Sequence, residues 1–179
     1  MALVSLNSTT VTVTGMTWKP DPANPGLDQA LTFVGRRTAP TGGAVEIWQL
    51  AAPSPGQAGS ALTHTLSANA KRVMGVHALQ GVGAVGSPVG VAASGTAIGV
   101  TVPSVTGGLV LDVVYGQNST TAYTAGAGQT ERWDINTTSG LGNLRGAGST
   151  EAGADAVAMT WTTGTATNLA LLAVSFNPY

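Results

Sequence analysis

Apolar residues in this chain recur at every second position, and this alternation constrains the fold more than any other feature of the sequence. Val11 and Val13 share one side of a strand pattern, and Leu31 and Phe33 share another, whereas the 3.6-residue period of a helix is almost absent. The 25 glycines and 9 prolines are spread along the chain, so the apolar runs between them stay short. The pattern therefore predicts strands joined by turns.

About ten short strands are expected, at residues 8–15, 27–35, 44–51, 61–67, 71–81, 95–103, 108–116, 129–136, 155–163 and 168–176. This spacing predicts an all-β fold, namely an antiparallel β-sandwich of jelly-roll-like arrangement. The length suits one domain with its own core, residues 1–179. Residues 1–10 are expected to form a short N-terminal arm. The Gly-rich stretches 81–95 and 136–155 are expected to form long loops at the ends of the sandwich.

The surface is expected to be neutral. Charged residues make up only 8% of the chain, against roughly 25% in a typical globular domain. The net charge is −1 and there is no basic stripe, so nucleic-acid binding is not expected. A surface rich in Thr, Ser, Asn, Gln and Gly suits extended contact with neighbouring subunits or with neutral sugars.

Cysteine is absent, which excludes disulfides and zinc–thiolate sites. No stretch of about 18 apolar residues is present, so no membrane span is expected. The first residues, MALVSLNSTT, lack the basic and apolar regions of a signal peptide. We therefore expect synthesis in a cytoplasm without export by the general route.

Residues 107–116, GGLVLDVVYG, are the most hydrophobic strand-like stretch and contain one carboxylate, Asp112. Leu111 points to one face of this strand, and Val110 shares the other face with Asp112. A strand that is apolar on both faces is expected to be central and covered on both sides. Because an isolated buried carboxylate is very costly, Asp112 is expected on the less buried face or beside a basic or Thr partner, in a structural role.

No catalytic constellation is expected. Glu131 and Asp134 are close in sequence but fall on opposite faces of one predicted strand, so they do not form a glycosidase pair. The only histidines, His64 and His77, lack metal-ligand spacing and are expected at half-buried strand positions. The G-x-S-x-G nucleophile and phosphate-loop motifs are absent. The chain is expected to be no enzyme and to need no cofactor.

One set of residues could bind calcium. Asp21, Asn24 and Asp28 lie in the Pro-stiffened segment DPANPGLD and could supply oxygen ligands. Their spacing matches no EF-hand, and the preferred interpretation is that they help to start a strand.

The aromatic residues divide between the core and a candidate sugar platform. Trp161 alternates in register with Val157 and Met159 and is therefore expected in the core. Trp48, Trp133 and Tyr123 would line the exposed face of a carbohydrate-binding module, if the chain is one. Core positions are favoured for them, because large apolar side chains dominate core energetics.

Several segments together carry a family resemblance. The first half contains VTGMTW, ALTFVG, VEIWQLAAPSPG, LTHTLS and VMGVHALQGV. The second half contains VTVPSVTGGLVLDVVYG, AGAGQTERWDI, GAGSTEAGADAVAMTWT and LALLAVSFNP. From about residue 10 to the end, the chain resembles a β-sandwich domain found in phage structural proteins and in large bacterial surface proteins. Members usually begin with an additional apolar strand, whereas MALVSLNSTT is shorter and more polar.

The resemblance implies a structural protein, since the shared motifs contain no catalytic residue. We expect a phage virion component, most specifically a capsid decoration protein that binds the major capsid protein or other virion proteins without covalent bonds. We expect it to be a homotrimer located in the virion. The alternative is a carbohydrate-binding or adhesion module.

Overall fold

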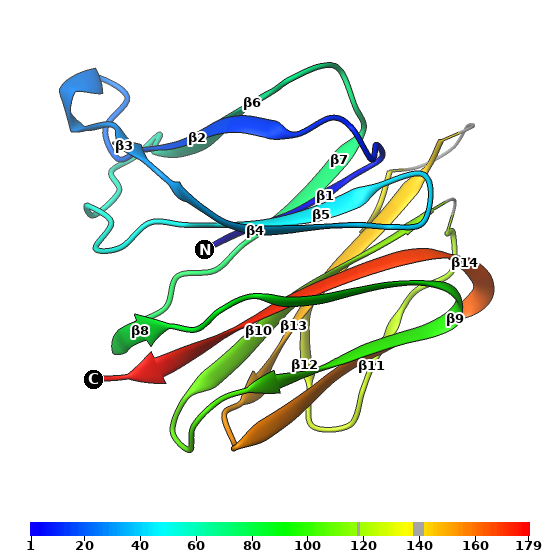
Figure 1. Ribbon diagram of the computed structural model, residues 1–179. Coiled ribbons are helices and arrows are strands. Elements are labelled where there is room, and N and C mark those ends of the chain that lie inside the picture. The colour runs from blue at the N-terminus through cyan, green and yellow to red at the C-terminus, as the bar shows by residue number, and fades with distance from the viewer. Residues whose placement is uncertain (118, 138–141) are drawn as a thin grey trace.

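The computed structural model describes residues 1–117, 119–137 and 142–179 (Figure 1). Apart from one 3₁₀ turn, η1 (Pro25–Leu27), the regular structure of these residues is all β. The strands are β1 (Ala2–Leu6), β2 (Val13–Lys19), β3 (Gln29–Ala30), β4 (Thr32–Thr38), β5 (Ala44–Gln49), β6 (Ala61–Leu66), β7 (Arg72–Val76), β8 (Val82–Val85), β9 (Val89–Pro103), β10 (Leu109–Gln117), β11 (Thr124–Ala125), β12 (Thr130–Asn136), β13 (Leu144–Ala152) and β14 (Ala156–Pro178).

These strands form three sheets, and every strand pair is antiparallel. Sheet A has the order β4-β5-β1-β7, and sheet B has the order β3-β2-β6. Sheet C has the order β11-β14-β10-β13-β12, with β8 and β9 also paired to β14. The sheets pack on one another, so the predicted antiparallel β-sandwich is confirmed.

Sheet A is the middle layer, because apolar side chains cover both of its faces. Leu3 and Ile47 pack in one cluster with Val113 of sheet C. On the other face, Val4 packs in a cluster with Met16 of sheet B. All five residues of β1 are therefore buried, and the strand lies between the two outer sheets (Figure 1).

The expectation of an N-terminal arm over residues 1–10 is wrong. Residues Ala2–Leu6 form an inner strand that pairs with β5 on one side and β7 on the other. Its one polar residue, Ser5, is buried and donates its hydroxyl to the Val114 carbonyl at 3.1 Å. Because both faces are covered, the strand has no polar alternation by which the sequence could mark it.

Sheet C bends back over itself through the long pair β9–β14. The two strands pair from Ala156↔Pro103 to Ala173↔Val89, with a register break between Thr162 and Thr167. The residues of β14 before this break, 156–162, form its bent part. Here Trp161 packs in a cluster with Val114 of β10, and Met159 packs in another with Val110. Strand β10 pairs with β13 and β14 and is fully covered, so the prediction of a central strand at 108–116 is confirmed.

Much of the two predicted long loops is strand. Residues 81–95 contain β8 and the start of β9. The described part of 136–155 contains β13, which lies between β10 and β12, while residues 138–141 lie outside the described residues. Two glycines of β13, Gly146 and Gly148, allow close packing of neighbouring side chains. A Cβ on Gly146 would lie 2.4 Å from Val73 Cγ2, and one on Gly148 would lie 2.6 Å from Trp133 Nε1. Strands β1, β8, β11 and β13 were not expected from the sequence, and the two strands expected at 155–163 and 168–176 are one continuous strand, β14.

Candidate functional site

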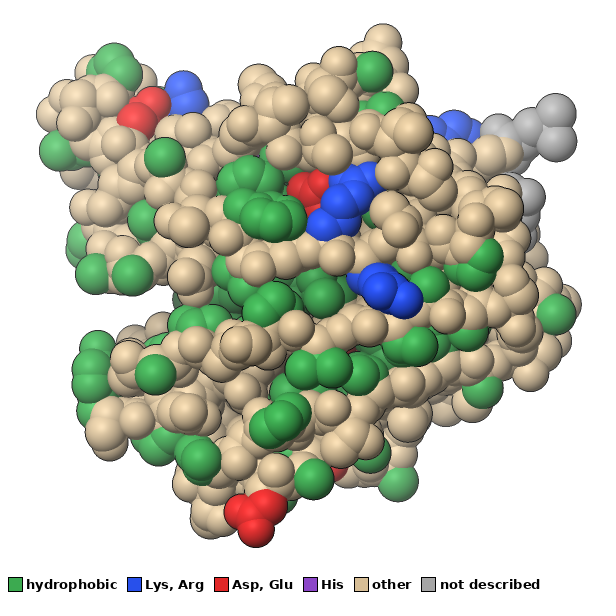
Figure 2. Space-filling view, viewed as in Figure 1, with side chains coloured by type: hydrophobic (Ala, Val, Ile, Leu, Met, Phe, Trp, Pro, Cys, Tyr) green, Lys and Arg blue, Asp and Glu red, His purple; other side chains and the backbone are tan. Residues whose placement is uncertain are grey.

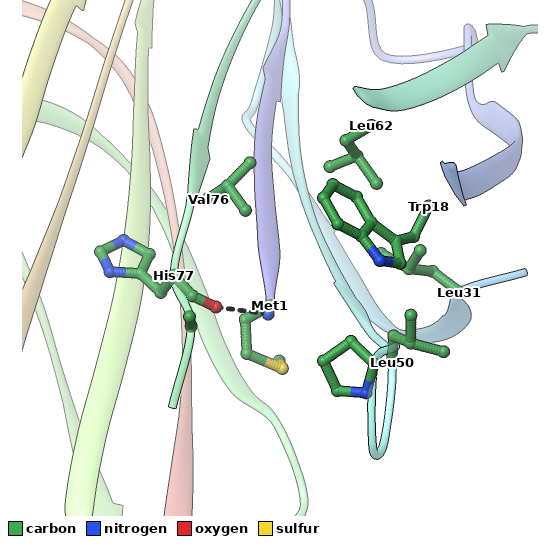
Figure 3. Close-up of a pocket in the computed structure, with 9 residues that line it drawn as sticks. Met1, Trp18, Leu31, Leu50, Leu62, Val76 and His77 are labelled. Carbon is green, nitrogen blue, oxygen red and sulfur yellow. Dashed lines mark hydrogen bonds between the residues drawn. The ribbon is translucent and has the colours of Figure 1, made fainter. Parts of the chain in front are cut away.

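An apolar groove opens between sheets A and B at one end of the molecule. The cavity has a volume of about 150 Å³ and is lined by Met1, Trp18, Leu31, Leu50, Pro53, Leu62, Val76, His77 and Ala78. Figure 3 shows Met1 and Val76 on one side of the space, facing Trp18, Leu31 and Leu62 on the other. An apolar cavity of about 150 Å³ accommodates a benzene-sized group. The groove can therefore seat one apolar side chain of a partner.

Backbone pairing and one side-chain hydrogen bond fix the walls of this groove. Ala2 pairs with Val76, and the amine of Met1 donates to the His77 carbonyl at 2.7 Å. On the facing wall, Trp18 donates its indole N–H to the Ser54 carbonyl at 3.0 Å. These contacts fix each wall and leave the space between the walls unfilled, so the groove is present without a bound partner.

Among the lining residues that the structure describes, none places a charged side chain in the groove, and the imidazole of His77 points away from it (Figure 3). Burial lowers the pKa of His77, and the positive charges of the Met1 amine and Arg132 lower it further. The imidazole is therefore neutral at neutral pH. Val76 at the rim is 59% exposed and continues the apolar lining of the groove to the surface.

Asp112 is completely buried in the middle of β10, on the face that the bent part of β14 covers. Its Oδ1 accepts hydrogen bonds from the backbone N–H and the hydroxyl of Ser149, both at 2.8 Å. Its Oδ2 accepts from Trp161 Nε1 at 2.7 Å and from Gln129 Nε2 at 3.4 Å. The predicted structural role thus has a physical basis, but the expected position is wrong, because the carboxylate is fully buried and is held by Ser, Trp and Gln.

Burial dominates the ionisation of Asp112. It raises the pKa of the carboxyl to about 7, against the lowering effect of the hydrogen bonds from Ser149 and Trp161. The negative charge of Glu151 adds a smaller upward shift of this pKa. Because none of the Asp112 surface is exposed, no substrate can reach the carboxylate, and the residue acts on stability rather than on a ligand.

Gln129 extends the contacts of Asp112 to two neighbouring segments. Its Nε2 also donates to the Ser149 hydroxyl at 2.7 Å. Its Oε1 accepts from the backbone N–H of Thr160 at 2.7 Å and from that of Gly126 at 3.1 Å. The amide therefore ties the turn before β12 and the bent part of β14 to the centre of sheet C.

The calcium candidates have other partners. The carboxylate of Asp28 pairs with Lys19 at 3.5 Å, and Asp21 accepts from the Ala23 N–H at 2.9 Å. Asn24 precedes η1 and is exposed. Over residues 1–117, 119–137 and 142–179, no three His, Cys, Asp or Glu side chains form a group that could hold a metal ion.

The proposed sugar platform is not exposed. Trp48 is 8% exposed and Tyr123 is 4% exposed, while Trp133 is partly buried against the core between sheets A and C. Trp48 instead makes an edge-to-face contact with Phe33, a residue that is 49% exposed. The three aromatics therefore form no sugar-binding strip. Trp161 lies in the core, as predicted.

Sequence reasoning missed the groove residues Met1, Leu31, Leu50, Leu62 and Val76. Leu62 alternates with exposed threonines in β6, which is a signal for an inward-facing residue. No pattern could show that it faces Val76, since the two belong to different sheets. Within the part of the chain that the structure describes, no helix is long and apolar enough to span a membrane.

Comparison with known proteins adds no relative. Neither a family model, nor a curated protein, nor a solved structure matches the chain.

Proposed function

We propose that this protein is a structural component of a phage virion, specifically a capsid decoration protein. The observation that supports the proposal best is the preformed apolar groove with exposed Val76 at its rim. A groove of this kind suits non-covalent seating of an apolar side chain from a capsid subunit.

The rest of the surface fits a broad, neutral contact. On the face shown in Figure 2, Lys, Arg, Asp and Glu form a few separate groups, and most of the surface is uncharged. Such a surface adds little repulsion when many copies lie side by side on a shell. A protein that binds only the assembled shell stabilises it by linkage, because binding lowers the free energy of the assembled state alone.

The proposal is tested by adding the purified chain to phage heads assembled without it and measuring the bound fraction by co-sedimentation. We expect saturable binding that raises the temperature at which the heads disrupt. Val76→Asp should weaken binding at least about tenfold, because a charge at the groove rim must be desolvated. Val105→Asp is the matched control, since Val105 is also exposed, at 42%, but lies outside the groove.

Two results would contradict the proposal. Absence of binding to any preparation of phage heads would show that the protein is not a capsid decoration protein. Equal binding of phage heads by the Val76→Asp variant and the wild type would show that the groove does not contribute to binding.

A further inference from the structure

Strand β9 is a long sheet edge. It pairs with β14 along its length, and no other described strand pairs with it. Figure 1 shows β9 running beside β14 through both halves of their shared bend. Near its start, the Arg37 side chain lies against Gly90. Beyond the bend, Ala97, Gly99 and Thr101 are exposed. The outer edge of residues 96–103 therefore presents backbone N–H and C=O groups that no described strand engages.

This edge lacks the features that usually prevent strand pairing between molecules. None of the 15 residues of β9 is Asp, Glu, Lys or Arg. Edge strands are normally guarded by charges, bulges or short length. Residues 97–102 of β9 contain no charge, no bulge and no proline, and Pro103 ends this strand of 15 residues.

Most of the other described sheet edges carry charges and a bulge or are short. Strand β4 carries Arg36 and Arg37 together with a bulge between Phe33 and Gly35. Strand β12 carries Glu131, Arg132 and Asp134 with a bulge of its own. Strand β7, an edge of sheet A, carries Arg72. The Nε of Arg72 donates to His64 of β6, an edge of sheet B that has six residues and no charge. Strands β3, β8 and β11 have at most four residues. The contrast marks β9 as an edge left open for pairing.

We infer that residues 96–103 of β9 are an interaction surface, and that a second copy of this chain pairs with them antiparallel about a two-fold axis. Because the strand is uncharged, two identical edges meet without opposing like charges. Pairing centred on Gly99 would place Ala97 opposite Thr101 of the second copy, and Ile98 opposite its Val100. The small outward side chains offer little for a foreign peptide to recognise, which favours the second copy as the occupant.

This inference goes beyond the proposed function and does not depend on it. A two-fold pairing of one strand with itself closes at two copies, because the same surface is used on both sides. The homotrimer expected from the sequence would need two different surfaces in contact. The number of copies in the assembly, two or three, therefore distinguishes the two-fold pairing of β9 from the expected homotrimer.

The test is sedimentation velocity over a range of concentrations, comparing the wild type with the variant Ala97→Lys/Thr101→Lys. Both positions are exposed, so the change should leave the fold intact. In the pairing described, each lysine would face a lysine of the second copy. We expect the wild type to form a dimer and the lysine variant to associate at least about tenfold more weakly.

A charge-matched control and a rescue complete the design. Thr14→Lys/Thr63→Lys adds the same charge to exposed positions of sheet B and should dimerise like the wild type. Mixing the lysine variant with Ala97→Glu/Thr101→Glu should restore a mixed dimer, and added salt should weaken it. A wild type that stays monomeric, a trimer, or a lysine variant that associates like the wild type would each overturn the inference. So would a wild type that pairs only with another protein through this edge.

Discussion

The indole N–H of Trp161 donates a 2.7 Å hydrogen bond to Asp112, so the buried carboxylate of β10 holds the bent part of β14 over sheet C. The two residues lie 49 positions apart in the chain. Several donors converge on this carboxylate and no Lys or Arg pairs with it among the described residues. The stability of the fold should therefore depend on pH and on each donor.

Asp112 should make the protein less stable as the pH rises. Its folded-state pKa of about 7 lies above the ordinary value of 3.8, so the folded state binds more protons than the unfolded state between these limits. The unfolding free energy should fall through this window by up to about 4 kcal/mol. Asp112→Asn, which cannot ionise, should remove this dependence. Urea titrations at pH 5, 6, 7 and 8 measure the unfolding free energy of the wild type and the variant. The same pH dependence in both proteins would show that Asp112 does not cause it.

Trp161→Phe should destabilise the fold by at least about 1.5 to 3 kcal/mol, because a hydrogen bond to a charged group is lost and a smaller ring replaces the buried indole. The loss should be greater at pH 8 than at pH 5, since the carboxylate is ionised at the higher pH. Trp18→Phe serves as the control. It removes a neutral indole bond to Ser54, so its smaller cost should not vary with pH. Thermal unfolding followed by circular dichroism reports both, and a pH-independent loss in Trp161→Phe would count against the carboxylate contact.

Arg36→Met should cost about 3 to 5 kcal/mol of stability, because it leaves Glu46 as an unpaired buried charge. Glu46 is 1% exposed and pairs with Arg36 and with Trp48 Nε1. Lys19→Ala breaks a solvent-exposed pair with Asp28 and should change stability by less than about 0.5 kcal/mol. Similar denaturation midpoints for the two variants would show that burial does not set the strength of the Arg36 pair.

Gly146→Ala should destabilise the fold by about 1 to 3 kcal/mol through overpacking. The added methyl group would lie 2.4 Å from Val73 and 2.6 Å from Ser5, at the contact between sheets A and C. Gly15→Ala is the control, because the nearest atom to its methyl group would be 3.4 Å away. If both variants unfold at the same denaturant concentration, the close approach of the sheets at Gly146 is not required.

The alternation of apolar residues was sufficient to predict the fold class. It located most of the strands, placed Trp161 in the core and marked residues 108–116 as a central strand. It failed at β1 and β13 for two different reasons. Strand β1 is covered on both faces and shows no alternation. Strand β13 contains Gly146 and Gly148, which resemble loop residues until the neighbouring side chains are seen.

Tertiary structure alone decided the environment of Asp112 and the position of the groove. The pairing of β10 with β13 sets Ser149 beside Asp112, and the bend in β14 brings Trp161 over the same carboxylate. Gln129 reaches this carboxylate from the turn before β12. In the same way, Leu62 and Val76 face one another only because sheet B packs on sheet A. Periodicity records which side of a strand a residue occupies. It contains no information on which strand covers that side, because that choice depends on contacts between residues far apart in the chain.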